Sequence, residues 1–217
     1  MAVRALLAEL ARDYEGRSGT PVKIESVGGV DAERRVREGE AFDFVVLARD
    51  AIDRLAASGS VDAASRVDIA RSGMAIAIRS GLPHPAVASE SHVRDAVTAA
   101  RRIGYSTGPS GRHLMALLER WGIAADVQPR LVQAPPGVGV GALLARGDAD
   151  LGFQQASEFL GVEGIDVLGH LPDAIQSMTT FAGATCGGAS HRDAAAGFLA
   201  FAGSREAAET RRRHGMA

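Results

Sequence analysis

The sequence lacks most of the residue patterns on which metal, cofactor or disulfide chemistry depends. Among its 217 residues there is a single cysteine, Cys186, so the chain can form neither an internal disulfide nor a thiolate metal site. The six histidines show no HExxH spacing, and we therefore expect no metal. There is no GxxxxGK[ST] motif, and residues 137–141 (GVGVG) do not form a GxGxxG fingerprint. We therefore expect no nucleotide cofactor.

An excess of one charge and a long apolar run are also missing. The net charge of −2 gives no electrostatic basis for binding nucleic acid. The longest uncharged runs, residues 131–145 and 174–190, are rich in glycine and polar residues, so we expect no membrane span. Charges interrupt residues 1–15, which excludes a signal peptide there. The sequence as written thus predicts a cytoplasmic protein, or a periplasmic or other extracytoplasmic one if the true start lies upstream.

Helix-like and strand-like segments alternate along the chain. Apolar spacing predicts helices at residues 1–14, 31–37, 50–58, 92–100, 138–146, 156–160, 191–202 and 204–214. Strand patterns occur at residues 21–26, 42–48, 72–79, 103–106, 126–133, 151–155, 165–168 and 176–185, the fifth of them at a sheet edge because of Pro129. This alternation predicts an α/β protein with mostly parallel sheets flanked by helices. The chain opens on a helix, although a strand normally comes first.

The most informative stretch is residues 102–121, RIGYSTGPSGRHLMALLERW. It predicts a buried strand, a turn rich in hydroxyls and glycine, and a helix from Arg112 with Ser110 as its N-cap. Amides of a first helical turn attract anions, and hydroxyl donors would assist. The candidate contacts here are Ser106, Thr107, Ser110, Gly111 and Arg112. The alternative is an ordinary strand–helix turn with a good cap.

Further candidates lie at similar positions elsewhere. They are Ser26, Gly28 and Gly29 before a helix, Val138 and Gly139 at another helix start, Gln154 and Gln155 at a strand end, and Arg71 beside a strand. Each also has a structural interpretation, as a helix cap or a solvated arginine. His113 follows the central turn, where it would be either a general base or a first-turn surface histidine.

The order of these pieces resembles the type 2 periplasmic-binding fold, and most of all the substrate-binding proteins of molybdate-type transporters. The resemblance lies in ARDYEGRSGTPVKIES, GGVDAERRVREGEAFDFVVLARDAIDRLAASG, SRVDIARSGMAIAIR, RIGYSTGPSGRHLMALLERWGI, LLARGDADLGFQQASEFL and the closing AAAGFLAFAGSREAAETRRRHGM. It implies two α/β lobes, residues 1–80 with 178–217 and residues 81–177, with a ligand cleft between them.

The resemblance also implies a small anion as ligand and an ABC transporter permease as partner. It assigns Ser26 to Gly29 to one lobe, and Ser106 to Arg112, Val138–Gly139 and Gln154–Gln155 to the other. The sequence departs from the family in two ways, because the strand and Ser/Thr-bearing loop that precede the family's first helix are missing, as is an export signal.

Our first expectation is therefore the binding component of an uptake system, with no catalytic residue. The alternative is an isomerase that moves a proton on a di- or tricarboxylate, as in aconitate isomerase, with His113, Glu33 or Glu158 as base. Tetrahedral oxyanions need few positive charges, whereas a tricarboxylate favours two inward-pointing arginines, Arg71 and Arg112. A cytoplasmic ligand sensor ranks last because the sequence shows no further interaction domain.

Overall fold

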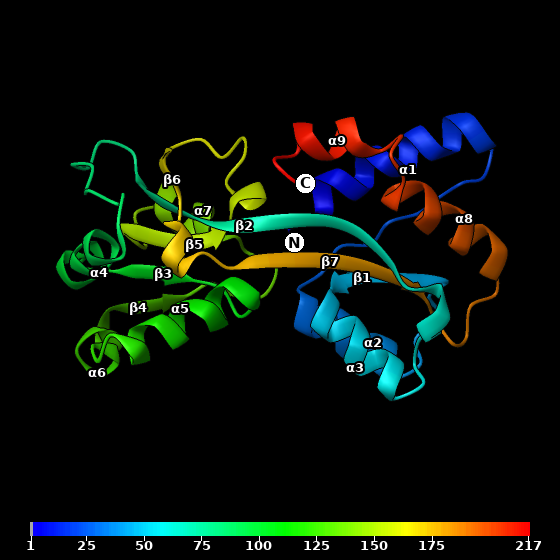
Figure 1. Ribbon diagram of the computed structural model, residues 1–217, viewed down its shortest axis with the longest axis horizontal. Helices are drawn as coiled ribbons and strands as arrows, with labels where there is room; N and C mark the ends of the chain where they lie inside the picture. The colour runs from blue at the N-terminus through cyan, green and yellow to red at the C-terminus, as the bar shows by residue number, and fades with distance from the viewer. Residues whose placement is uncertain (1) are drawn as a thin grey trace. The chain divides into compact units, whose positions relative to one another are not determined.

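A computed structural model describes residues 2–217, and Figure 1 shows its elements. The chain forms two compact units, unit 1 from Met1–Ser72 with Thr179–Ala217, and unit 2 from Gly73–Met178. It enters unit 2 within strand β2 (Val67–Arg79) and returns to unit 1 at the start of β7 (Met178–Thr185). The sequence had indicated divisions at 80/81 and 177/178.

Unit 1 is a small sheet covered on both faces by helices. Its strand order is β1-β7-β2, and β1 (Phe44–Ala48) runs antiparallel to β7. Side chains alternate along β7, so that Phe181 packs with one cluster of apolar residues while Ala182 and Ala184 pack with another. Figure 1 shows the helices on the two sides of these strands. They are α1 (Arg4–Ser18), α8 (Arg192–Gly203) and α9 (Ala208–Arg213) on one side, and α2 (Gly29–Arg37) and α3 (Arg49–Ala57) on the other.

Unit 2 has the strand order β6-β2-β5-β3-β4. Strand β2 pairs antiparallel with both β5 (Leu151–Gln155) and β6 (Ile165–His170). Strand β3 (Ile103–Tyr105) pairs parallel with β5 and with β4 (Leu131–Gln133). The carboxyl ends of β3 and β5 therefore meet at one edge of the sheet, which is where ligands bind in open α/β sheets.

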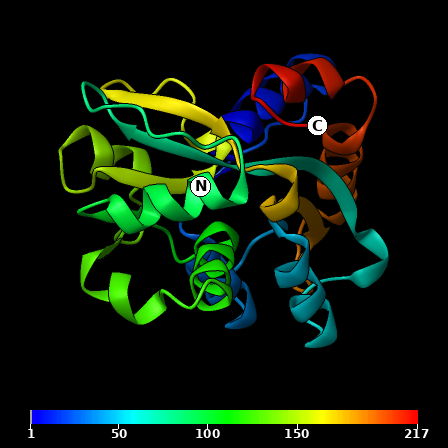
Figure 2. The same ribbon diagram turned by 60° about the vertical axis from the view of Figure 1, so that its left-hand side comes forward.

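Alternate residues of β2 again serve two layers. Met74, Ile76 and Ile78 belong to the cluster under α4 (Glu90–Ala99) and α5 (Pro109–Arg120), while Ala75 and Ala77 pack toward α7 (Val140–Ala145). In the turned view of Figure 2 the green helices of this unit lie below the yellow and teal strands. The helix α6 (Ala124–Val127) packs on the same apolar cluster through Val127.

The two-lobed α/β fold class is confirmed, but the sheets are mixed rather than mostly parallel. The order of elements along the chain does not fix strand direction, and the long strand β2 runs against both of its unit 2 neighbours. The edge position predicted for residues 126–133 is confirmed for the part that forms a strand, residues 131–133, because β4 ends the strand order.

Several predicted elements differ in kind. Residues 21–26 form no strand, and residues 126–130, predicted as strand, form the end of α6 and a turn of 3-10 helix (Gln128–Arg130). The helix predicted over 156–160 is only a 3-10 turn (Ala156–Glu158), and the last helix begins at Ala208 instead of residue 204. The first helix runs on to Ser18 and stops at Gly19, whose φ of 69° suits glycine. Residue 1 of the predicted first helix lies outside the described residues.

No helix in the described part, residues 2–217, is long and apolar enough to cross a membrane.

Candidate functional site

The first turn of α5 follows directly from the end of β3. The helix begins at Pro109, whose ring fixes φ for a first helical position, and the N-cap is Gly108. The predictions that the helix opens at Arg112 and that Ser110 is the cap are therefore wrong. The first intrahelical bond runs from the Arg112 amide to the Gly108 carbonyl at 3.1 Å. The preceding amides of Ser110 and Gly111 thus lack an intrahelical acceptor and lie at the positive end of the helix dipole.

This turn packs tightly on the end of β3. The hydroxyls of Ser106 and Ser110 lie 3.1 Å apart, and the Ser106 hydroxyl accepts the Gly108 amide at 3.3 Å. A Cβ atom at Gly111 would lie 1.6 Å from the Ser106 carbonyl oxygen, so only glycine fits there. Ser110 is buried, while Thr107 at the tip is exposed. The result is a rigid turn with its hydroxyls and amides gathered at one place.

The end of β5 meets the start of α7. Gln154 is 2% exposed, its Oε1 accepts the Val140 amide at 2.8 Å, and its Nε2 donates to Oε2 of Glu158 at 2.6 Å. The helix starts at Val140 with Gly139 as N-cap, two residues after the predicted start at Val138. Gln154 thus satisfies the first amide of α7 itself, which supports the cap interpretation of this residue.

Glu158 is the titratable group with the most unusual environment in unit 2. Loss of hydration on burial raises the pKa of Glu158 from 4.5 to about 7, and the hydrogen bond from Gln154 opposes this shift. The side chain of its neighbour Gln155 is likewise buried, at 2% exposed. A carboxyl group that titrates near neutrality can both accept and return a proton.

His113 lies one turn into α5 and is partly buried. Its Nε2 lies 2.8 Å from the Ile175 carbonyl, which can only accept, so Nε2 carries a proton and Nδ1 holds the lone pair in the neutral ring. The adjacent Gln176 accepts the amides of Met74 and Ser177 and donates to the Met74 and Leu171 carbonyls. Sequence reasoning missed Gln176, because its partner Met74 stands about a hundred positions earlier and no local motif marks the pair.

The remaining candidates belong to unit 1. Ser26 and Gly28 are partly buried and Gly29 is exposed, with Gly28 as the N-cap of α2. The pKa of Glu33 is lowered, first by the hydrogen bond from Arg54, so its carboxylate is held ionised in an ion pair and is a poor base. Arg71 is exposed and its backbone pairs with Ala217.

The structure therefore brings together the unit 2 candidates from the ends of β3 and β5 and the starts of α5 and α7. Neighbouring residues Ile103 and Leu151 pair in register, so the two strands end side by side. Arg112, in the first turn of α5, is exposed. Among residues 2–217 there is no group of three or more His, Cys, Asp or Glu side chains that could hold a metal ion.

Comparison with known proteins identifies the family of the chain. A family model described as "Bacterial extracellular solute-binding protein" matches residues 1–217. The chain belongs to this solute-binding family. A curated relative, aconitate isomerase from a Pseudomonas species, is 34% identical over 215 residues, which cover 95% of this chain and 81% of that protein.

Solved structures of this architecture include the periplasmic molybdate-binding protein of Azotobacter vinelandii. It is 18% identical with a TM-score of 0.83, and the match covers 100% of this chain and 95% of that one. The tungstate ABC transporter protein of Geobacter sulfurreducens is 15% identical with a TM-score of 0.74, covering 95% and 91% of the two chains. At identities of 18% and 15%, these two matches show that the proteins share a fold with this chain.

Proposed function

We propose that this solute-binding protein binds a small carboxylate anion through the first turn of α5. The amides of Ser110 and Gly111, the dipole of a twelve-residue helix and the hydroxyls of Ser106 and Ser110 all favour a negative group at that place. No metal is needed for such binding, because amide and hydroxyl donors can satisfy carboxylate oxygens.

We further propose that the bound carboxylate is isomerised by proton transfer, with aconitate as the first substrate to test. The observation that carries this proposal is Glu158, a carboxyl group with a raised pKa of about 7 that accepts a hydrogen bond from Gln154 at the end of β5. A carrier needs no such group, whereas proton transfer at a carbon requires a base that titrates near neutrality. The 34% identity to an aconitate isomerase over 95% of the chain supports the choice of substrate.

The chemistry would be a balanced 1,3-transfer. Glu158 in its carboxylate form removes a proton from the methylene carbon of one aconitate isomer, and the electron pair of that bond delocalises over the neighbouring double bond. The protonated Glu158 then returns the proton to the other end of the three-carbon unit, which shifts the double bond and regenerates the carboxylate. No oxidant, reductant or second substrate is consumed. His113 is a second candidate for the base that removes the proton, because its Nε2 donates to the Ile175 carbonyl and leaves the Nδ1 lone pair as acceptor.

A second candidate function is the capture of a tetrahedral oxyanion for an uptake system, with an ABC transporter permease as partner. The specific observation in its favour is that Arg71 and Arg112 both have exposed side chains. A tricarboxylate would gain from two arginines around it, whereas a tetrahedral oxyanion is satisfied by amides and hydroxyls alone. An extracytoplasmic location would follow from this function and stays a prediction.

A thermal-shift panel separates the two functions. The purified protein is heated with molybdate, tungstate, sulfate, phosphate, citrate, and cis- and trans-aconitate in turn. A ligand at a hundred times its dissociation constant adds about 2.7 kcal/mol to the free energy of unfolding, which raises the melting temperature measurably. We expect both aconitates to shift it. A shift with molybdate and tungstate alone would contradict the isomerase and support the carrier.

A further inference from the structure

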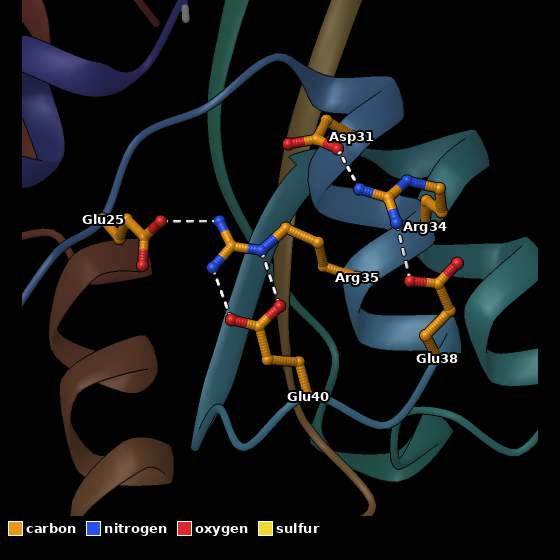
Figure 3. Close-up of polar contacts among 6 residues, drawn as sticks. All are labelled: Glu25, Asp31, Arg34, Arg35, Glu38 and Glu40. Atoms are coloured by element: carbon orange, nitrogen blue, oxygen red, sulfur yellow. Dashed lines mark hydrogen bonds and ion pairs between the residues drawn. The ribbon is translucent and has the colours of Figure 1, made fainter.

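Arg35 on α2 is a mostly buried arginine whose partners come from the residues before and after its helix in the sequence. Its side chain is 17% exposed, and its Nε and Nη2 donate to the two carboxylate oxygens of Glu40 at 2.7 and 2.5 Å. Its Nη1 donates to Oε1 of Glu25 at 2.6 Å, and the guanidinium lies 5.0 Å from the centre of the Phe42 ring. Figure 3 shows Arg35 between the two glutamates. The planar group is thus fixed by three partners, a geometry that lysine could not reproduce.

Glu25 ties down a segment that has no regular secondary structure. Residues 19–28 belong to no helix or strand. They include Ser26 and Gly28 and lead directly into the start of α2. Nearer its start the segment is held by the Val22 amide, which donates to the Glu15 carboxylate at 2.7 Å. The contact between Glu25 and Arg35 is the tie at the end next to Ser26.

The neighbouring Arg34 has different contacts. It donates to Asp31 at 2.5 Å and to Glu38 at 2.6 Å, both within one turn along the same helix or just past its end. Its side chain is 55% exposed. Figure 3 shows this arginine with its contacts to Asp31 and Glu38, away from Glu25. The two adjacent arginines therefore offer a comparison in which only one can hold the segment before α2.

We propose that Arg35 is a positioning residue, which holds Ser26 to Gly29 in the conformation that the ligand requires by binding Glu25. This inference rests on the proposed function and on the prediction from the sequence that Ser26 to Gly29 contribute to anion binding. Arg35 acts through Glu25 and does not itself contact the ligand.

The physical basis is conformational entropy. A segment without strand or helix partners samples many backbone conformations unless side chains hold it. If only a fraction of molecules has the binding conformation, the apparent dissociation constant rises by the reciprocal of that fraction. Loss of the tie should therefore weaken binding by at most about fivefold, which corresponds to an exposed ion pair worth up to about 1 kcal/mol. An isomerase would then show a higher KM with kcat largely unchanged at saturation.

The test uses two matched pairs of variants in the full chain. Glu25→Ala removes an exposed glutamate bound to Arg35 at 2.6 Å, and Glu38→Ala removes one bound to Arg34 at the same distance, with side chains 57% and 60% exposed. Arg35→Met and Arg34→Met form the second pair. For each variant we would measure amide hydrogen exchange over residues 19–28 and titrate cis-aconitate and molybdate by calorimetry.

We expect faster exchange of residues 19–28 and weaker binding in Glu25→Ala and Arg35→Met, with neither change in Glu38→Ala or Arg34→Met. Unchanged exchange in Glu25→Ala would overturn the proposal, as would faster exchange with an affinity equal to that of Glu38→Ala. If neither probe binds the wild-type protein, the proposed function fails, and the exchange arm still decides whether Arg35 holds the segment.

Discussion

Replacing Glu158 by glutamine tests the environment assigned to this carboxyl group. Its folded-state pKa of about 7 lies above the ordinary 4.5, so the folded protein binds the proton more tightly than the unfolded chain. By linkage, wild-type stability is unaffected below about pH 4.5 and falls as the pH rises from there to about 7. Glutamine carries no charge and its Oε1 can still accept the hydrogen bond from Gln154. The stability of Glu158→Gln should therefore not fall through this carboxyl group as the pH rises.

The magnitude follows from the two pKa values. Linkage gives a wild-type penalty of about 1 kcal/mol near pH 5 and about 3 kcal/mol near pH 8. The stability of Glu158→Gln relative to wild type should thus improve by about 2 kcal/mol between these conditions. Any effect of the substitution on packing is the same at both pH values and cancels in this difference.

The assay is urea unfolding followed by the fluorescence of Trp121, the single tryptophan of the chain, which lies in unit 2 with Glu158. Its indole nitrogen donates to Glu90 at 2.7 Å, so the probe reports the folded environment of α5. Glu163→Gln is the control, since it removes the same charge from an exposed position of the same segment. A relative stability of Glu158→Gln that does not change with pH, or that changes equally in the control, would refute a partly buried carboxyl group with a raised pKa.

Three further substitutions test the packing around the site by the same unfolding assay, with Gly16→Ala in α1 as a control. Gly111→Ala places a Cβ 1.6 Å from a backbone carbonyl oxygen, so it should lower the free energy of unfolding by more than about 3 kcal/mol and abolish ligand binding. The Cβ of Gly16→Ala meets nothing within 4 Å, so this control should stabilise the protein by about 0.5–1 kcal/mol. Gln154→Met removes the side-chain acceptor of the Val140 amide, the first amide of α7, and should lower the free energy of unfolding by about 1–3 kcal/mol. Gln176→Met leaves two backbone amides without their side-chain acceptor and should cost a similar amount, and a loss below about 0.5 kcal/mol in either glutamine variant would contradict the assigned hydrogen bonds.

The sequence was sufficient to predict the candidate turn, but not its details. Hydroxyls and glycines between a buried strand and an amphipathic segment correctly predicted a strand–helix junction near Ser110. The start of α5 was misplaced because Ser110 is a good N-cap by type, while the observed start depends on Pro109 and on contact with β3. The need for glycine at Gly111 arises from the Ser106 carbonyl, a contact that only folding creates.

Longer-range features were beyond the reach of local patterns. Residues 21–26 alternate like a strand, but they have no neighbouring strand, and a contact to Arg35, ten residues later, holds Glu25 instead. The raised pKa of Glu158 depends on burial that no local pattern reveals, so this residue was one of three equal candidates for the base. Glu33 was another, and its ion pair with Arg54, 21 residues away, decides against it.

The most direct test of the account is a proton NMR experiment with cis-aconitate in deuterated buffer. The wild-type protein should form trans-aconitate, and deuterium should enter the reprotonated carbon to the extent that the carboxyl group of Glu158 exchanges its proton with the solvent. Glu158→Gln should bind cis-aconitate with similar affinity but convert it at least about a hundredfold more slowly, as expected when a general base is removed. Binding of cis-aconitate by the wild-type protein without conversion or deuterium exchange would contradict proton transfer and leave a carboxylate-binding protein.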